Sequence, residues 1–474
     1  MIGREKERNS LLKTLDSDES EFVAVYGRRR VGKTYLVREA FGNRFVFEHT
    51  GLAHTDMRGQ LRAFKDSMAR NGLARKRHSF RSWYEAFLAL SDELSRLPDG
   101  KKVVFLDELP WLDTQGSRLI GALEHFWNGW AAARKDVVLV VCGSATSWIV
   151  ERLLRAKGGL YNRVTRSVPL RPFTLAECER YAVSRGIALE RPELAEAYMA
   201  FGGIPFYWRQ LEPGASLAQN LDRLFFAPDA PLRGEFGQLY DSLFRKAEDH
   251  VRIVRALATK KAGMTRDEIL RATGIAGNGR FSRELEQLEQ CGFVRRYVAF
   301  GKRRKEALWQ LVDGFTLFHF RFLEGDPNPD ARFWSASVAS PALSAWRGLA
   351  FERLCLLHLP QIKAALGIAG VLTKTCSWRH VPDAVHPDGA QVDLLIDRDD
   401  RIVDLCEMKW THGAYALDKE EAEKLRDRCE IFRAVTGTDK AVHVVLATPF
   451  GLRPNLHSGL VQNVVTLADL FRDA

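Results

Sequence analysis

The first third of the chain alternates short apolar runs with longer segments whose apolar residues recur at helical spacing. Most of the short runs are rich in valine and end in polar residues or glycine. This alternation predicts an α/β fold in which a parallel sheet is flanked by helices. The predicted strands are Phe22–Tyr26, Arg44–Glu48, Lys102–Leu106, Val137–Cys142 and Arg166–Leu170.

The pattern changes after residue 172. It becomes helical from about Phe173 to Phe226, and it continues as helices and a hairpin to about Asp313. The glycine- and proline-rich stretch Glu324–Arg332 is typical of a linker, and a further α/β unit follows it. At 474 residues the chain is longer than one core usually organises. We therefore predict four domains, namely residues 1–172, 173–244, 245–325 and 333–474.

Composition excludes several classes of protein. The seven cysteines are scattered without a Cys-x-x-Cys pair, which argues against a zinc site or disulfide framework and favours a reducing cytoplasm. No apolar run reaches the roughly 20 residues needed to span a bilayer. The highly charged first twenty residues are unlike a secretory signal. We expect a cytoplasmic protein with no membrane partner, and the net charge of +10 suggests a polyanionic one.

The strand Phe22–Tyr26 runs directly into a glycine-rich loop, and a helix is expected to open at its end. This strand–loop–helix order is the context of a phosphate-binding loop, whose backbone N–H groups face the phosphates. In that role Lys33 neutralises the β- and γ-phosphates, and Thr34 places its hydroxyl on Mg²⁺. The loop predicts an ATP site; the alternative is a chance match in an ordinary loop. Its residues are Gly27, Arg28, Arg29, Arg30, Val31, Gly32, Lys33 and Thr34.

A second strand supports this site by ending in two carboxylates, Asp107 and Glu108. We expect Asp107 to hold Mg²⁺ through its water shell and Glu108 to orient and activate the attacking water. The alternative is an acidic pair that caps the surface of the sheet.

Weaker candidates surround the site. Ser144 follows the strand Val137–Cys142, where it could sense the γ-phosphate or cap the next helix. Arg163 could act as an arginine finger in cis or from a neighbouring subunit, which would require a homo-oligomer. The loop residues Arg28–Arg30 could contact the nucleotide or have solvated or interdomain roles.

Five segments resemble those of a known family: Ile2-Gly3-Arg4-Glu5, YGRRRVGKT, LDELPWL, CGS and FGGIP. Over roughly residues 1–325 the chain resembles the archaeal-type ATPases, of the signal-transduction branch of AAA+-like P-loop proteins. The resemblance implies a five-stranded ATPase core followed by a helical lid, residues 173–244. It also implies that Pro205, in Gly203-Ile204-Pro205, lies near the nucleotide base. Without the resemblance, Pro205 would be only a helix breaker.

The segment Arg245–Val312 carries 16 lysines and arginines against 8 acidic residues. Its pattern predicts three helices, with a capping box at Thr265–Glu268, and a hairpin tipped by Gly301–Lys305. This is the layout of a winged helix that could bind DNA through its tip and third helix. The alternative is a rigid arm without nucleic-acid contact, because charge alone does not show sequence recognition. The predicted helices are His250–Lys260, Asp267–Ala272 and Arg280–Gln290, and the hairpin strands are Phe293–Phe300 and Glu306–Val312.

A hairpin near the end of the chain carries the next candidate site. Because residues two apart on a strand share a face, Glu407 and Lys409 point the same way. A turn centred on Asp400 would place Asp393 opposite Glu407 on that face, whereas a turn centred between Asp399 and Asp400 would separate them. The shared site therefore requires an odd-membered loop. The two strands are Gln391–Ile396 and Ile402–Trp410, joined by Asp397–Arg401.

Two carboxylates and a lysine on one sheet face can bind Mg²⁺ and aim a water at a phosphodiester. The set Asp393, Glu407 and Lys409 is similar to that of PD-(D/E)xK nucleases, whose helical glutamate matches Glu352. Val392 stands where that family is named for proline. Such a domain often follows archaeal-type ATPases, and it can also bind without cleaving. An Asp and Glu-x-Lys on a solvated strand is the alternative, and His412 is a structural or metal-proximal residue.

The leading hypothesis is an ATPase that gates or drives a Mg²⁺-dependent nuclease-like domain acting on nucleic acid, DNA in the first instance. The alternatives are a non-cleaving DNA-binding ATPase switch and an ATPase that regulates a protein partner.

Overall fold

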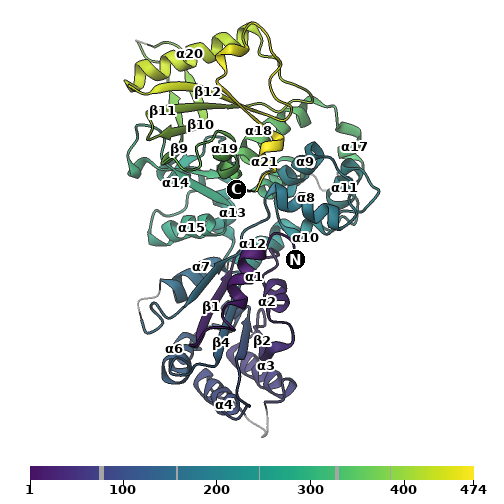
Figure 1. The fold of residues 1–474 in the computed structure, drawn as a ribbon, viewed down its shortest axis with the longest axis vertical. Helices are drawn as coiled ribbons and strands as arrows, with labels where there is room; N and C mark the ends of the chain where they lie inside the picture. The colour runs from purple at the N-terminus through teal and green to yellow at the C-terminus, as the bar shows by residue number, and fades with distance from the viewer. Residues whose placement is uncertain (74–78, 156–157, 245, 326–329, 385, 474) are drawn as a thin grey trace. The chain divides into compact units, whose positions relative to one another are not determined.

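The computed structural model describes residues 1–474 except 74–78, 156–157, 245, 326–329, 385 and 474. The chain divides into two compact units. The first is Met1–Pro172 with Asp241–Arg245, and the second is Phe173–Tyr240 with Lys246–Ala474. Apart from residues 241–245, the helical, basic and C-terminal segments predicted from the sequence thus lie together in the second unit. Figure 1 labels many of the helices and strands of each unit.

A five-stranded, all-parallel sheet forms the centre of the first unit, in the order β2-β3-β4-β1-β5. All five predicted strands are present within two residues of the expected ends. The α/β, parallel-sheet prediction is therefore confirmed. The strands are β1 Glu21–Tyr26, β2 Phe45–Thr50, β3 Lys102–Asp107, β4 Val137–Gly143 and β5 Arg166–Pro169.

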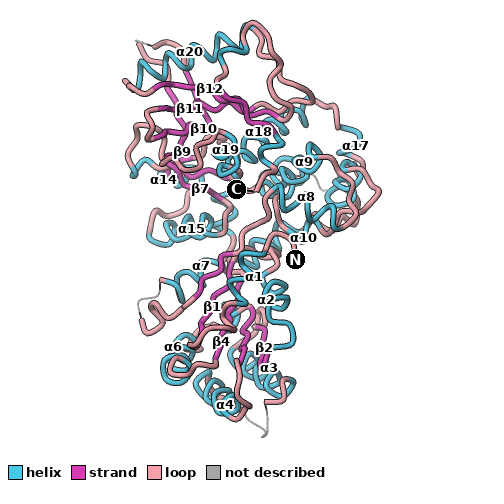
Figure 2. Tube along the Cα trace, in the orientation of Figure 1, coloured by secondary structure: helices cyan, strands magenta, loops and turns pink. Residues whose placement is uncertain are grey.

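Helices flank this sheet (Figure 2). Three of its strands, β1, β3 and β4, are almost completely buried. Because both faces are covered, the strands appear as continuous apolar runs rather than alternating ones. Each buried valine or phenylalanine contributes about 1.5–3 kcal/mol relative to exposure. The carboxyl ends of β1, β3 and β4 are therefore held side by side. The helices are α1 Glu5–Leu12, α2 Lys33–Phe41, η1 Gly42–Arg44, α3 Met57–Arg70, α4 Trp83–Ser95, α5 Leu109–Leu112, α6 Leu119–Phe126, η2 Trp127–Ala131, α7 Thr146–Ile149 and η3 Val150–Leu154.

The second unit begins with helices that are tied to the C-terminal sequence by buried polar bonds. Asp222 accepts the backbone N–H of Trp334 at 2.7 Å, and Glu196 pairs with the Arg347 guanidinium at 2.9 and 3.0 Å. Part of the predicted linker, residues 326–329, lies outside the described residues. The elements are α8 Leu175–Ser184, α9 Arg191–Phe201, α10 Pro205–Trp208, α11 Leu217–Leu221, η4 Asp222–Phe226, α12 Glu235–Leu243, α16 Gly314–Phe318, η6 His319–Leu323 and α17 Phe333–Ser337.

Three helices and a small antiparallel sheet occupy the basic segment, with strand order β6-β8-β7. We call this part the α13–β8 module. The expected capping box is present, with Glu268 N–H donating to Thr265 Oγ1 and Thr265 N–H donating to Glu268 Oε2. The elements are α13 Glu248–Ala258, β6 Met264–Thr265, α14 Arg266–Thr273, α15 Gly279–Gln290, β7 Val294–Tyr297, η5 Arg304–Glu306 and β8 Leu308–Leu311.

A mixed sheet in the order β13-β12-β11-β10-β9 ends the second unit. β10 and β11 pair as Leu394 with Cys406 and Leu395 with Leu405, a register centred on Asp400. Of the two registers that the sequence left open, the structure has the one with the odd-membered loop. The elements are α18 Pro341–Leu357, α19 Leu359–Ala365, β9 Thr373–His380, β10 Ala390–Arg398, β11 Ile402–Met408, α20 Lys419–Thr436, β12 Ala441–Thr448, η7 Ser458–Leu460, β13 Asn463–Thr466 and α21 Leu467–Leu470.

Two general features complete the fold. All seven cysteines are buried as free thiols. Among the described residues, none of the helices combines the length and the apolar character that crossing a bilayer would require.

Candidate nucleotide site and carboxylate clusters

The loop after β1 is built around two glycines that no other residue could replace without strain. Gly27 has φ +152°, and a Cβ there would lie 2.1 Å from the carbonyl oxygen of Leu170. Gly32, with φ +93°, is the N-cap of α2. Both backbone angles lie in the region that L side chains rarely adopt. The loop can therefore curl tightly at the positive end of the α2 dipole, where anions bind.

Lys33 is folded back over this loop and is 5% exposed. Its Nζ donates to the carbonyl oxygens of Gly27 at 2.9 Å and Arg28 at 2.8 Å. The ammonium is thus held by backbone dipoles inside the loop, where its charge is available to a phosphate.

Thr34 and Asp107, the two residues predicted to hold Mg²⁺, are in direct contact. Thr34 Oγ1 donates to Asp107 Oδ2 at 2.9 Å, and the Glu108 N–H donates to Asp107 Oδ1 at 3.0 Å. Asp107 is 4% exposed, so it does not cap the surface. Hydroxyl and carboxylate oxygens are ligands that Mg²⁺ prefers, and Thr34 and Asp107 therefore fit the ion.

Ser144 holds Glu108. Its Oγ donates to Glu108 Oε2 at 2.8 Å and its N–H donates to the same oxygen at 3.1 Å. The N-cap of α7 is Ala145, whose side chain makes no cap bond, so the helix-capping alternative for Ser144 is wrong. The contact arises because β4 lies between β1 and β3. Glu108 has φ +46°, an uncommon conformation for a residue other than glycine and a mark of local strain.

Burial raises the pKa of the Cys142 thiol well above its usual value, and the charge of Asp107 adds to that shift. The residue next to the site is therefore a neutral, unreactive thiol rather than a nucleophile.

The other residues predicted for the nucleotide site lie in the loop itself, before β5 and at the start of α10. Arg28 and Val31 are buried in the loop, and Arg30 has φ +68°. Arg163 is exposed in the turn before β5. Pro205 is the first residue of α10 in the second unit. A Cβ on neighbouring Gly203 would lie 1.9 Å from the Phe173 carbonyl oxygen, so close backbone packing explains that glycine.

The C-terminal carboxylates fall into two clusters. In the first, Lys261 of the α13–β8 module lies between Glu352 of α18 and Asp393 of β10. Its Nζ is 2.7 Å from Glu352 Oε1 and 3.0 Å from Asp393 Oδ2. Burial, reinforced by the charge of Asp393, raises the pKa of Glu352 to about 6. Glu352 Oε2 is buried and has no hydrogen-bond partner among the described residues.

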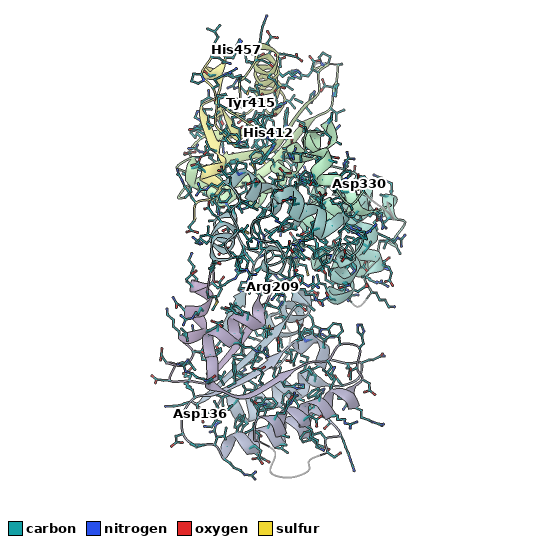
Figure 3. All side chains as sticks on the ribbon, turned by 90° about the vertical axis from the view of Figure 1, so that its right-hand side faces the viewer. Asp136, Arg209, Asp330, His412, Tyr415 and His457 are labelled. Carbon is teal, nitrogen blue, oxygen red and sulfur yellow. The ribbon has the colours of Figure 1, made fainter. Side chains whose placement is uncertain are left out.

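In the second cluster, Glu407 pairs with Lys409 at 3.3 Å and with Arg428 of α20. Lys409 Nζ also lies 3.1 Å from Glu421 Oε2. Burial lowers the pKa of Lys409, but Glu407 and Glu421 outweigh burial and raise it, so the side chain stays charged. His412 is exposed in the loop after β11, in the C-terminal part of Figure 3.

A β-bulge explains why the two clusters are separate. The β10–β9 register shifts between Val392 and Leu395, both of which lie in the core beneath α20. The bulge turns Asp393 to the α18 side of the sheet. Glu407 lies two residues after Leu405 on β11, so it shares the face of Leu405 and points to α20. The predicted joint Mg²⁺ site of Glu352, Asp393 and Glu407 is not assembled. No cluster of three or more metal-ligating His, Cys, Asp or Glu side chains occurs in the part of the chain that the structure describes.

Sequence reasoning missed Lys261, Arg428 and Glu421. Lys261 lies within the most basic segment, but its partners are 91 and 132 positions away along the chain, and no periodicity links them. The Glu421–Lys409 and Arg428–Glu407 pairs depend on how α20 packs on the sheet.

Comparisons with known proteins support the nucleotide site. Residues 1–211 match the model of a family described as an ATPase domain predominantly from Archaea. The match contains the loop, Asp107, Glu108 and Ser144. It supports ATP binding and hydrolysis by this part of the chain.

The longer matches are more distant. The chain is 24% identical over 416 residues to the uncharacterized protein MJECL04 of Methanocaldococcus jannaschii, covering 86% of this chain and 87% of that one. The Walker-type ATPase PABY2304 of Pyrococcus abyssi has a TM-score of 0.47 and 17% identity, covering 68% of this chain and 96% of that one. The Aeropyrum pernix ORC2 protein, solved as ADPNP–ADP complexes, has a TM-score of 0.41 and 15% identity, covering 72% and 96%. Both TM-scores are below 0.5, so we assign the nucleotide site from its own geometry and the domain match.

Proposed function

We propose that this protein hydrolyses ATP at the loop after β1 and that hydrolysis controls a C-terminal, nuclease-like domain acting on nucleic acid, with DNA as the substrate class. The observation that carries the first half is the connected set Thr34–Asp107–Glu108–Ser144 beside a glycine loop. The match of residues 1–211 to an ATPase domain supports the same half.

At the nucleotide site, loop N–H groups and Lys33 bind the phosphates, and Thr34 and Asp107 hold Mg²⁺. When bound, the ion neutralises phosphate charge. Glu108 orients the attacking water and accepts its proton, and Ser144 sets the direction of the Glu108 carboxylate. We also propose that Pro205 and the loop arginines contact the nucleotide and that Arg163 acts as an arginine finger, in cis or within a homo-oligomer.

Two substitutions test ATP hydrolysis. Lys33→Ala should abolish detectable ATP binding, whereas Glu108→Gln should keep binding and lower turnover by about 10²–10⁴-fold. Glu39→Gln, an exposed carboxylate on α2, is the matched control and should behave as wild type. Turnover by Glu108→Gln within about threefold of wild type would exclude Glu108 as the base.

The second half concerns nucleic acid. We propose that the α13–β8 module is a winged helix, because its element order and basic hairpin tip fit one. We propose residues 333–474 as a nuclease-like domain on the basis of the Asp393, Glu407 and Lys409 pattern and the helical Glu352. The Glu352–Asp393 pair fits a divalent cation, since it offers carboxylate oxygens, including Glu352 Oε2, which has no hydrogen-bond partner in the part of the chain that the structure describes. Glu407, held by Arg428 on the other face, does not fit the same ion.

A specific observation favours a second candidate, a non-cleaving DNA-binding switch. Lysine or arginine side chains pair with Glu352, Asp393 and Glu407. Such internal neutralisation suits a domain that binds rather than cuts. Mg²⁺-dependent degradation of DNA by wild type, lost in Asp393→Asn and in Lys409→Ala, would establish cleavage. DNA binding without degradation would establish the switch. Absence of DNA binding even at low salt would point to a protein partner instead.

A further inference from the structure

Lys261 occupies an unusual position for a lysine of a basic module. It follows α13 in the turn that leads to β6, yet its ammonium lies between carboxylates supplied by α18 and β10. By contrast, its neighbour Lys260 pairs with Glu268 of α14, at 2.6 Å and within the same module. Both lysines thus pair with carboxylates, but that of Lys260 lies within the module and those of Lys261 lie on α18 and β10.

The Glu352–Asp393 pair offers the oxygen ligands that a divalent cation requires. An ammonium can bind the same carboxylate oxygens at short range, but it carries one positive charge where a divalent cation carries two. Both cannot occupy the position between Glu352 Oε1 and Asp393 Oδ2, because the two cations would repel each other in a largely buried place. Removal of the ammonium leaves the two adjacent carboxylates without this ion pair, although the charges of Arg353 and Arg295 still act on them.

We propose that Lys261 and a divalent cation are alternative occupants of the Glu352–Asp393 pair, and that Lys261 keeps the pair closed to the cation. The inference rests on the proposed function only in assigning this pair to the nuclease-like site. Lys261 is then the residue that regulates cation access to that site.

The backbone of Lys261 is fixed, so its side chain is the part that can move. Its carbonyl oxygen accepts from Gln310 Nε2 at 2.7 Å and from Arg353 Nη2 at 2.5 Å. The next carbonyl, of Ala262, accepts from Tyr297 Oη at 2.5 Å. These bonds anchor the turn to β7, β8 and α18. Rotation about the side-chain bonds therefore costs less than withdrawal of the turn.

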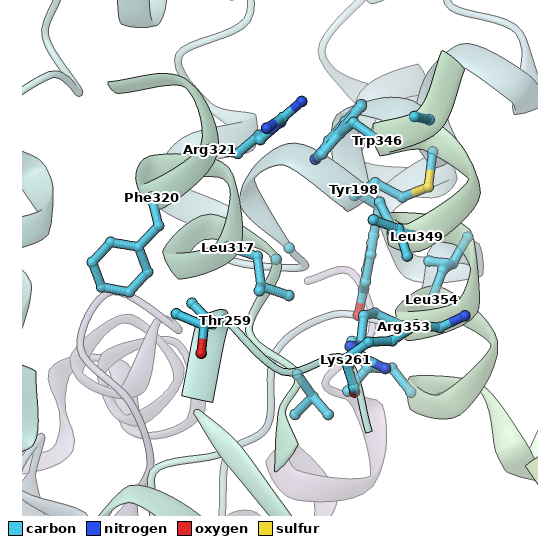
Figure 4. A pocket seen from close by; sticks show the side chains of 18 residues that line it. Tyr198, Thr259, Lys261, Leu317, Phe320, Arg321, Trp346, Leu349, Arg353 and Leu354 are labelled. Carbon is cyan, nitrogen blue, oxygen red and sulfur yellow. Dashed lines mark hydrogen bonds between the residues drawn. The ribbon is translucent and has the colours of Figure 1, made fainter. Parts of the chain in front are cut away.

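A neighbouring cavity gives the side chain room to turn. The cavity has a volume of about 340 Å³ and lies among α9, α13, η6 and α18. Figure 4 shows Lys261 and Arg353 together at one end of it, with Arg321 on the far side. The Lys261 side chain is 36% exposed, so its ammonium can reach water when it leaves the carboxylates.

Cation binding by the full-length, nucleotide-free protein tests the proposal, with Mn²⁺ as the probe in isothermal titration calorimetry. Lys261→Met should bind Mn²⁺ at least about tenfold more tightly than wild type, which corresponds to about 1.4 kcal/mol. Lys261→Arg keeps the positive charge and should bind as weakly as wild type. Lys260→Met is the matched control and should not change the affinity.

The double variant Lys261→Met, Asp393→Asn should lose the tight binding, which locates it at this pair. Unchanged or weaker Mn²⁺ binding by Lys261→Met would overturn the proposal. Should that variant fail to melt cooperatively, Lys261→Gln, with a polar side chain, carries the same comparison. Because these titrations use no nucleic acid, tight Mn²⁺ binding without DNA degradation would refute the nuclease activity and leave this inference intact.

Discussion

At the scale of single residues, the nucleotide site is organised by hydrogen bonds between neighbouring strand ends. Glu108 is the residue on which they converge, since its carboxylate accepts two bonds from Ser144 and its N–H bonds to Asp107. A charge-assisted bond inside a protein contributes about 1.5–3 kcal/mol. The direction of Glu108 is therefore set by Ser144 rather than by solvent.

Ser144→Ala should lower ATP turnover by about tenfold or more and leave nucleotide affinity within about twofold, because only the direction of the Glu108 carboxylate is lost. Steady-state hydrolysis and equilibrium nucleotide binding measure the two quantities. Ser147→Ala, a buried serine on α7, is the control. A loss of affinity with unchanged turnover would contradict the role given to Ser144.

His358 makes the stability of the second unit depend on pH. Its Nε2 accepts the Leu175 N–H at 3.1 Å, so its other nitrogen, 2.9 Å from the Leu354 carbonyl oxygen, donates. The bond from Leu175 requires the neutral ring, because a protonated Nε2 cannot accept, and burial lowers the pKa of His358 to about 4. The pKa in the unfolded chain is about 6.5, so the stabilisation is complete above that pH. It is lost as the pH falls from 6.5 towards 4, by about 3 kcal/mol in all.

His358→Gln should therefore be less stable than wild type at pH 7.5, while the difference between the two narrows at pH 5. Denaturant unfolding at both pH values, followed by near-ultraviolet circular dichroism, measures this. Other buried histidines titrate in both proteins, so the comparison isolates His358. A constant difference between the two proteins would show that the ring does not resist protonation.

At the scale of elements, the sequence predicts what depends on periodicity and motif. The parallel strands, the loop at Gly27–Thr34 and the capping box at Thr265 are local patterns, and the structure contains them. The turn centred on Asp400 was one of two registers that the sequence left open. The bulge between Val392 and Leu395 could not be predicted from the sequence, because a strand with one extra residue still has a composition typical of a strand. That bulge decides which face Asp393 occupies.

Interactions between elements far apart in the chain could not be predicted from the sequence either. The buried Glu196–Arg347 pair joins α9 to α18 across 151 positions, and neither residue stands out in the sequence. Arg347→Met should destabilise the second unit by about 3–5 kcal/mol, because it leaves the Glu196 charge buried and unpaired.

Denaturant unfolding of the full-length chain measures this destabilisation. Arg401→Met removes an arginine–aspartate pair whose side chains are 71% and 77% exposed, and it should change stability by less than about 1 kcal/mol. Equal effects of the two substitutions would mean that burial does not govern the Glu196–Arg347 pair.

At the scale of the whole molecule, the excess positive charge is unevenly distributed. The tip of the α13–β8 module presents four exposed cations, Lys302, Arg303, Arg304 and Lys305. Replacing all four by serine should weaken DNA binding and reduce the salt dependence of the affinity. The logarithmic slope should fall by about 0.9 for each DNA phosphate that the tip no longer neutralises.

Fluorescence anisotropy of labelled duplex DNA over a range of salt concentrations measures the slope. Replacing four exposed cations elsewhere by serine, namely Lys419, Lys424, Arg401 and Arg472, is the control for net charge alone. An unchanged slope in the tip variant would remove the tip from the DNA interface.

The buried cysteines have a practical consequence for observing the two units at work. Because all seven native thiols are shielded from solvent, maleimide dyes should leave the unaltered chain unlabelled. A cysteine introduced at Tyr161 in the first unit and another at Leu372 in the second would each replace an exposed side chain, 58% and 72% accessible. Energy transfer between a donor and an acceptor dye on these positions would then follow the distance between the units through single rounds of ATP turnover, in a protein that keeps every native cysteine.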